Sequence, residues 1–231
     1  YYVLFNPTAD NTDIDGIGTR ATNAGAVTVA DAGTGVHGYV DAPATSFVGT
    51  HDNDGIGSNG QDQVVQFNNG NLLLLNPQWH GNAGAATFVD LRGGGALGGV
   101  VDETTSVVGT ATATPTTNTD RIGSDPFSVY EFNNDRFALG SPEWSGQTGA
   151  LTWGSTTSGF SGVVSTGNSL VGANPLDRVG DCCNGRFGGA PQELIYCVEA
   201  TQCPVVIADG KRALGIVQAG GSLIEGVVAG D

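Results

Sequence analysis

Short apolar segments alternate with polar turn clusters along the whole chain. Val64–Phe67 and Leu72–Leu75 flank the turn Asn-Asn-Gly-Asn, and Val129–Phe132 and Phe137–Leu139 flank a similar polar turn. Segments of four to seven β-branched, aromatic or leucine residues between Gly, Asn, Asp and Ser clusters are typical of strands joined by tight hairpins. No apolar period of about 3.6 residues extends beyond a turn or two. The pattern therefore predicts an all-β fold with about four short strands in each unit.

The strand pattern also repeats. The segment Ser46–Gly49 (Ser-Phe-Val-Gly) recurs at Ser106, at Ser169 and, more weakly, at Ser222, at intervals of 60, 63 and 53 residues. Three copies are followed by an Asp-containing turn that ends in Ile-Gly or Val-Gly. A period of this size predicts a propeller, a solenoid or a tandem array. We divide one repeat domain, residues 1–231, into the units 1–45, 46–105, 106–168 and 169–221, with 222–231 completing the first.

The two ends of the chain are complementary. Tyr2–Pro7 matches Leu72–Pro77, so the chain starts inside a unit, and residues 222–231 begin a new one. A β-propeller closes its ring in this way, with strands from both ends in one blade. We expect a β-propeller closed by N- and C-terminal strands. The alternative is an open β array, or an array completed by a second chain.

The net charge of the chain limits the classes of partner that it is expected to bind. Eight Lys and Arg against 23 Asp and Glu give a net charge of −15. Nucleic acids and anionic membranes need a basic surface, so we expect neither as a partner. No apolar run approaches the roughly 20 residues of a membrane-spanning helix, so we expect no membrane insertion. The chain begins Tyr-Tyr-Val without a signal peptide, and we read it as a processed protein or a piece of a longer one.

The four cysteines lie close together in the sequence. They are Cys182, Cys183, Cys197 and Cys203. Their spacing is not that of paired zinc ligands, and no histidine is near them. We expect two disulfides in one irregular loop, and three pairings are open. Disulfides indicate an oxidising compartment outside the cell.

The repeated segments together form a longer sequence pattern. Its parts are Asn-Ser-Leu-Val-Gly, Asp-x-Val-Gly, Asn-Gly-Asn, Pro-x-Trp and Gly-Ala-x-Thr-Trp. It resembles a repeat of secreted and cell-surface bacterial proteins, including filamentous-haemagglutinin-like adhesins, and residues 149–172 match it best. More distantly, the pattern resembles the FG-GAP blade of integrin-type propellers. The resemblance implies a location at the cell surface and a structural or adhesive role, and it implies no reaction.

Two turns are candidates for calcium. In each, two carboxylates lie two residues apart before a glycine, an arrangement that can turn oxygens toward one cation. The candidate ligands are Asp13, Asp15, Asp52 and Asp54. FG-GAP blades bind calcium in such loops. The other two units keep only the last of these aspartates, Asp120 and Asp177. The alternative is an Asx-turn, in which the Asp accepts backbone N–H groups two residues further on.

Aromatic and titratable residues give little sign of a reaction. Trp79 and Trp144 recur at one position of the unit, which favours core packing over an exposed platform for sugars. His37, His51 and His80 lie at unrelated positions, and the chain has no Gly-x-Ser-x-Gly motif. We therefore expect no catalytic residue and no enzyme activity.

These observations favour a non-enzymatic, extracellular structural or adhesive repeat protein, with calcium as the one cofactor to consider. Its expected partners are further copies of itself, other surface proteins or glycans. Unpaired strand edges and the two ends are the expected contacts, because such edges pair with other chains. A subunit of a surface filament or sheath fits this description. The alternatives are a carbohydrate-binding propeller and, less favoured, an extracellular hydrolase.

Overall fold

The computed structural model describes residues 1–11, 21–93, 97–110, 120–132 and 135–181, and the backbone of four later strands. The described strands form four sheets, which confirms the expected β fold. Given in spatial order, the strands of the first sheet are β1 (Tyr2–Asn6), β2 (Ala26–Ala30), β3 (Phe47–Val48) and β7 (Gly99–Val100). Those of the second sheet are β12 (Gly162–Val163), β8 (Ser106–Val108), β6 (Ala85–Val89), β5 (Leu72–Asn76) and β4 (Val64–Gln66).

The third and fourth sheets have four strands each. Those of the third are β13 (Ser169–Val171), β11 (Ala150–Ser155), β10 (Arg136–Ser141) and β9 (Val129–Phe132). Those of the fourth are β14 (Glu193–Cys197), β15 (Val205–Asp209), β16 (Ala213–Val217) and β17 (Leu223–Ile224). Helical structure in the described ranges is limited to single turns, which are α1 (Trp79–Asn82), α2 (Trp144–Gln147), Gly60–Gln63 and Pro126–Ser128.

Strands of one unit join the sheet of the unit before it. β7 lies between β6 and β8 in the sequence, yet it pairs in parallel with β3 of the first sheet, Val48 opposite Val100. β12 pairs with β8 of the second sheet in the same way, Val163 opposite Val108. The Ser-x-Val-Gly segment that opens a unit in the sequence thus joins the sheet before it, and β7 or β12 forms the edge of that sheet. Each of the first two sheets therefore contains strands from two consecutive units.

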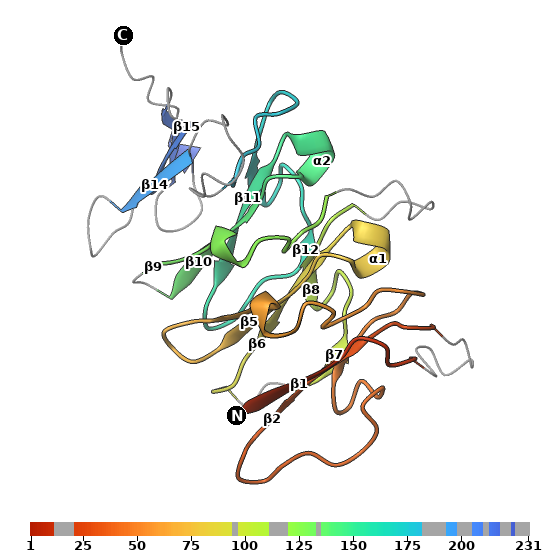
Figure 1. Cartoon of the computed structure of the whole chain (residues 1–231). Helices are drawn as coiled ribbons and strands as arrows, with labels where there is room; N and C mark the ends of the chain where they lie inside the picture. Colours follow the sequence, from red (N-terminus) through yellow and green to blue (C-terminus); the bar gives the residue numbers. More distant parts are fainter. Residues whose placement is uncertain are drawn as a thin grey trace.

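The first three sheets pack face to face. In β5, Leu72 and Leu74 belong to the core shared with the first sheet, whereas Leu73 and Leu75 belong to the core shared with the third. A strand buried on both faces needs apolar residues at every position, which explains the run of four leucines. Figure 1 shows the sheets following one another along the molecule, from β1 and β2 at the lower end to β11 at the upper end.

The described strands form no closed ring. β1 pairs with β2 in the first sheet, and β17 pairs with β16 in the fourth, so no pairing of described residues joins the two sheets. The closed propeller is therefore not confirmed, because the last strand joins its sequence neighbour instead of β1. Residues 225–231 lie outside the described part of the chain. No helix in the described ranges is long and apolar enough to cross a membrane.

Candidate functional site

The contact between the residues that follow β3 of the first sheet and α1, which we call the corner, is built around Asp54, a predicted calcium ligand. Its side chain is fully buried. Oδ2 accepts the backbone N–H groups of Thr50 and His51, both at 2.8 Å, and Oδ1 accepts the N–H of His80 at 2.8 Å. Three charge-assisted hydrogen bonds compensate the loss of water around the carboxylate. Asp54 therefore ties the end of the Ser-Phe-Val-Gly segment to the turn that follows Trp79.

The same corner recurs in the other units. Asp120 accepts the backbone N–H of Thr110 at 2.8 Å and that of Ser145 at 2.9 Å. Asp177 accepts the N–H of Ala173 at 2.8 Å. Thr110 and Ala173 follow the Ser-x-Val-Gly segment as Thr50 does, and Ser145 follows a tryptophan. The repeated aspartate is thus a fixed part of the scaffold.

Asp52, another candidate calcium ligand, is more exposed than Asp54. The Oδ1 atom of Asp52 accepts the backbone N–H of Thr22 at 2.7 Å. Asp13 and Asp15 lie outside the described residues. Among the residues that are described, no group of three or more His, Cys, Asp or Glu could hold a metal ion. Asp54 accepts backbone N–H groups, as in the turn alternative, but from residues three and four earlier and 26 later in the chain instead of two residues on. Calcium stays a prediction.

A glycine in each unit marks a close approach of two backbones. Gly84 has φ of +79° and forms a parallel bridge with Ile122. A Cβ atom at Gly84 would lie 2.2 Å from the backbone nitrogen of Ile122. Two further pairs have the same geometry, Gly25 with Ile56 and Gly149 with Val179. The glycine of the Gly-Ala-x-Thr segment is therefore required by both backbone conformation and space.

A pair of hydroxyl groups recurs beside this glycine. The Thr of Gly-Ala-x-Thr contacts the Ser of Ser-x-Val-Gly across two paired strands. The Oγ1–Oγ distances are 2.6 Å for Thr28–Ser46 and 2.7 Å for both Thr87–Ser106 and Thr152–Ser169. The first two pairs are buried. The repeated hydroxyl groups thus bond to each other inside the sheet.

The tryptophans pack into the molecule. Trp79 has 2% of its surface exposed, and its Nε1 donates to the carbonyl oxygen of Val101 at 2.9 Å. Trp144 and Trp153 are half-buried. Trp144 packs against the core between the second and third sheets, and Trp153 against a cluster formed by Ala138, Leu151 and Val179. The ring of Trp153 lies 5.3 Å from that of Phe132. The expected core position holds most clearly for Trp79.

Two of the three histidines lie together. The rings of His51 and His80 are 3.9 Å apart, and Nδ1 of His51 is 3.4 Å from Oδ2 of Asp54. Burial lowers the pKa of His80, and His51 lowers it further. His37 lies on an exposed segment of the first unit. The pair is peculiar to the second unit, because Ser145 takes the place of His80 in the third.

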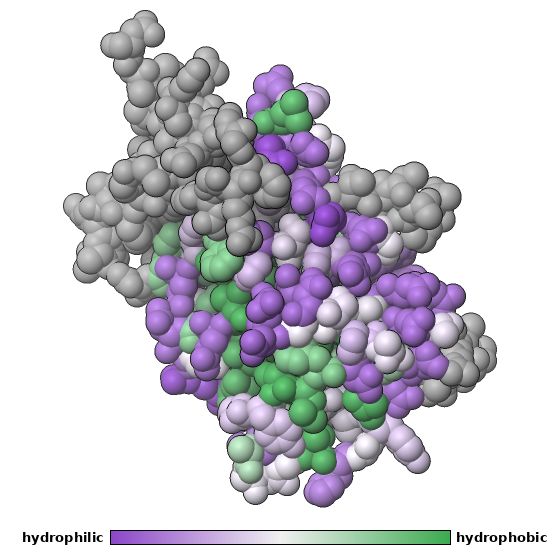
Figure 2. All heavy atoms as spheres, in the orientation of Figure 1, coloured by the Kyte–Doolittle hydropathy of each residue, from purple (hydrophilic) through white to green (hydrophobic). Residues whose placement is uncertain are grey.

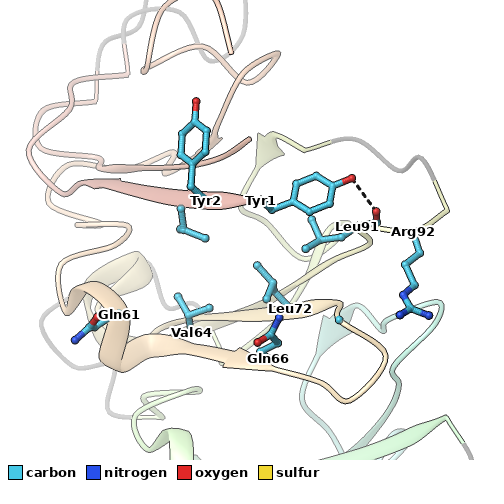
Figure 3. A pocket seen from close by; sticks show the side chains of 10 residues that line it. Tyr1, Tyr2, Gln61, Val64, Gln66, Leu72, Leu91 and Arg92 are labelled. Atoms are coloured by element: carbon cyan, nitrogen blue, oxygen red, sulfur yellow. Dashed lines mark hydrogen bonds between the residues drawn. The ribbon is translucent and has the colours of Figure 1, made fainter. Parts of the chain in front are cut away.

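A cleft lies between β1 and the hairpin of β4 and β5. Its volume is about 580 Å³. Figure 3 shows Tyr1 and Tyr2 on one side, Val64 and Leu72 on the other, and the Tyr1 hydroxyl donating to the carbonyl oxygen of Leu91 at 3.0 Å. Apolar residues gather over β1 and this hairpin in Figure 2. The sequence did not reveal the cleft, because its walls come from strands about 60 residues apart.

The cysteine predictions fall mostly outside the described residues. Cys182, Cys183 and Cys203 are not among them, and only the backbone of Cys197, in β14, is described. Their two disulfides stay a prediction.

A family model described as a repeat of unknown function (DUF5650) matches residues 16–58, 66–124 and 131–181. The three matches cover about two thirds of the chain. The chain belongs to this family. Each copy of the DUF5650 repeat ends just after a corner aspartate, and the second copy contains β5, β6 and β8 of one sheet. No curated protein and no solved structure matches the chain. The likenesses to adhesins and to FG-GAP blades stay predictions.

Proposed function

We propose that this DUF5650 protein is a non-enzymatic structural or adhesive component of an extracellular surface. One observation carries the proposal: the polar side chains that recur from unit to unit are bonded to the fold itself. The corner aspartates hold backbone N–H groups, and the Thr–Ser pairs bond to each other. A reaction needs polar groups that converge on a substrate. The recurring groups instead build a scaffold.

The arrangement of the sheets supports the same role. Repeat proteins whose units contact mainly their neighbours present long surfaces. Through β7 and β12, main-chain pairing joins consecutive units, in addition to the apolar packing between their sheets. We therefore favour an open array, with further copies, other surface proteins or glycans as partners. The net charge of −15 favours a soluble chain and gives no support for binding nucleic acid.

Surface labelling of the producing cells tests the location. An antibody against residues 1–231 should label intact cells, and protease added outside them should remove the signal. Deletion of the gene should reduce adherence or disturb a surface layer in electron micrographs. A protein found only in the cytosolic fraction would contradict the proposal.

A further inference from the structure

We propose that His51 and His80 bind a divalent transition-metal ion of the kind that prefers imidazole ligands, such as Zn²⁺ or Cu²⁺. His51 follows β3 of the first sheet, and His80 lies in α1, after β5 of the second sheet. A metal ion held by both side chains would therefore connect two sheets. The inference goes beyond the proposed surface role and does not depend on it.

The backbone places the two histidines side by side. The N–H groups of His51 and His80 both donate to the carboxylate of Asp54, at 2.8 Å each. The ring centroids lie 3.9 Å apart, with an angle of 46° between the ring planes. In a tetrahedral site with metal–nitrogen distances of about 2.0–2.1 Å, two ligand nitrogens lie roughly 3.3 Å apart. Nitrogen atoms of rings this close can reach that separation by rotation of the side chains.

Asp54 also orients the ring of His51. Nδ1 of His51 lies 3.4 Å from Oδ2 of Asp54 and 2.8 Å from Oγ1 of Thr50. Because a carboxylate only accepts hydrogen bonds, this position favours the tautomer with the proton on Nδ1. Nε2 then carries the lone pair that binds a metal ion. A carboxylate behind a ligating imidazole is common at zinc sites, since it fixes the tautomer and makes the ligand more basic.

The protonation state of His80 suits it to metal binding. Burial, and then the neighbouring His51, lowers its pKa below the ordinary value of 6.5, whereas Asp54 and Glu103 act in the opposite direction. The neutral imidazole therefore predominates at pH 7, and a metal ion needs to displace no proton from it. The negative charges of the two carboxylates also favour a cation beside the rings.

The histidine pair is open to solvent on one side. The side chain of His51 is 44% exposed, whereas His80 is half-buried. No third His, Cys, Asp or Glu of the described residues completes a metal site, so water supplies the remaining ligands. Asp54 itself is not a ligand, because its oxygens already accept three N–H groups. Two imidazoles with water favour Zn²⁺ or Cu²⁺ over Ca²⁺, which takes about six to eight oxygen ligands.

The fold does not require the two histidines. In the fourth unit Asn174 takes the place of His51, and its backbone N–H donates to the corner aspartate at 2.7 Å, as that of His51 does at 2.8 Å. In the third unit Ser145 takes the place of His80, with φ of +49° against +47°. The corner thus forms with Asn and with Ser at these positions, and folding alone does not explain why the second unit has two imidazoles there.

Isothermal titration calorimetry with Zn²⁺, in excess Ca²⁺ to occupy surface carboxylates, tests the proposal. The double variant His51→Asn/His80→Ser introduces the residues of the other units, so its corner should fold. The wild type should bind one more Zn²⁺ per chain than this variant. Each single variant should weaken that binding at least about tenfold, because even an outer partner of a metal ligand has an effect of that size. The cysteines are unchanged in these variants, so any Zn²⁺ that they bind cancels in the comparison.

The matched control is His37→Asn, at the exposed third histidine of the chain. This variant should bind Zn²⁺ as the wild type does and show the same rise in melting temperature when Zn²⁺ is added. Two results would overturn the proposal: a wild type that binds no more Zn²⁺ than the double variant, or an equal loss of binding in His37→Asn. Circular dichroism of each variant without metal establishes that it is folded.

Discussion

At the residue scale, the corner aspartate is the side chain that joins separate segments of the repeat by hydrogen bonds. Asp54 accepts the N–H of His80, 26 residues away, as well as those of Thr50 and His51, while its neighbour Asp52 accepts one N–H near the surface. A buried donor without an acceptor costs more than a surface hydrogen bond contributes. The two aspartates of one turn therefore have very different effects on stability.

Removing the buried carboxylate is the first test. Asp54→Ala removes the buried carboxylate that three partly buried N–H groups share, and we expect the free energy of unfolding to fall by about 3 kcal/mol. Asp52→Ala is the matched control, with an expected loss of about 1 kcal/mol or less. Urea denaturation measures both. Equal losses would mean that the corner contacts do not stabilise the fold.

The second test uses two glycines with similar backbone angles. Gly84→Ala puts a Cβ 2.2 Å from a backbone nitrogen, so we expect loss of folding or of about 3 kcal/mol or more. Gly146 has φ of +69° and no heavy atom within 4 Å of its Cβ position. Gly146→Ala should cost about 1–2 kcal/mol, from the left-handed backbone alone. Thermal melting of the two variants separates crowding from backbone strain.

The third test concerns pH. Burial disfavours the charged form of His80, so its pKa in the folded protein is below the ordinary value of 6.5. Stability from this residue is complete above that value and is lost as pH falls through it toward the folded pKa. His80→Ser introduces the residue that the third unit has at this position, Ser145. This variant should make the melting temperature less sensitive to pH between about 7.5 and 5.5. An unchanged slope would show that other groups control it.

At the scale of strands, the local sequence pattern predicted most of the strands but did not predict which strands pair with one another. The segment Leu72–Leu75 and the turn before it predicted β5 and its hairpin with β4, because nearby residues set the register of a hairpin. The parallel pairing of β7 with β3 joins residues about 50 apart, and two-residue strands have no periodicity to read. The partners of Asp54 were hidden for the same reason, since His80 lies on a turn 26 residues away.

The hydroxyl pair between β6 and β8 gives the fourth test. Ser106→Ala leaves the buried Thr87 hydroxyl without its partner, and we expect a loss of about 1–2 kcal/mol. Adding Thr87→Val removes the second hydroxyl, so the double variant should be more stable than the two separate losses predict, by about 1 kcal/mol. Additive losses in urea would mean that the pair makes no net contribution.

At the scale of the whole molecule, divalent cations can be tested directly. Both carboxylate oxygens of Asp54 already accept backbone N–H groups, so we expect the turn at Asp52 and Asp54 to add no difference between the melting temperatures in calcium and in chelator. A rise with calcium would favour the turn at Asp13 and Asp15, and Asp13→Asn/Asp15→Asn should then abolish it. Asp52→Asn is the control for the second turn.

The pairing of strands with the sheet of the preceding unit also affects which insertions and deletions the chain can tolerate. Because β7 and β12 are each added to the edge of the sheet of the unit before, no unit of the first three sheets separates from its neighbour without breaking a sheet. A duplication or deletion of one full period leaves every sheet complete, wherever in the period it begins. A change of half a period leaves one sheet without its parallel strand. Gene rearrangements should therefore be tolerated in whole periods, at any phase.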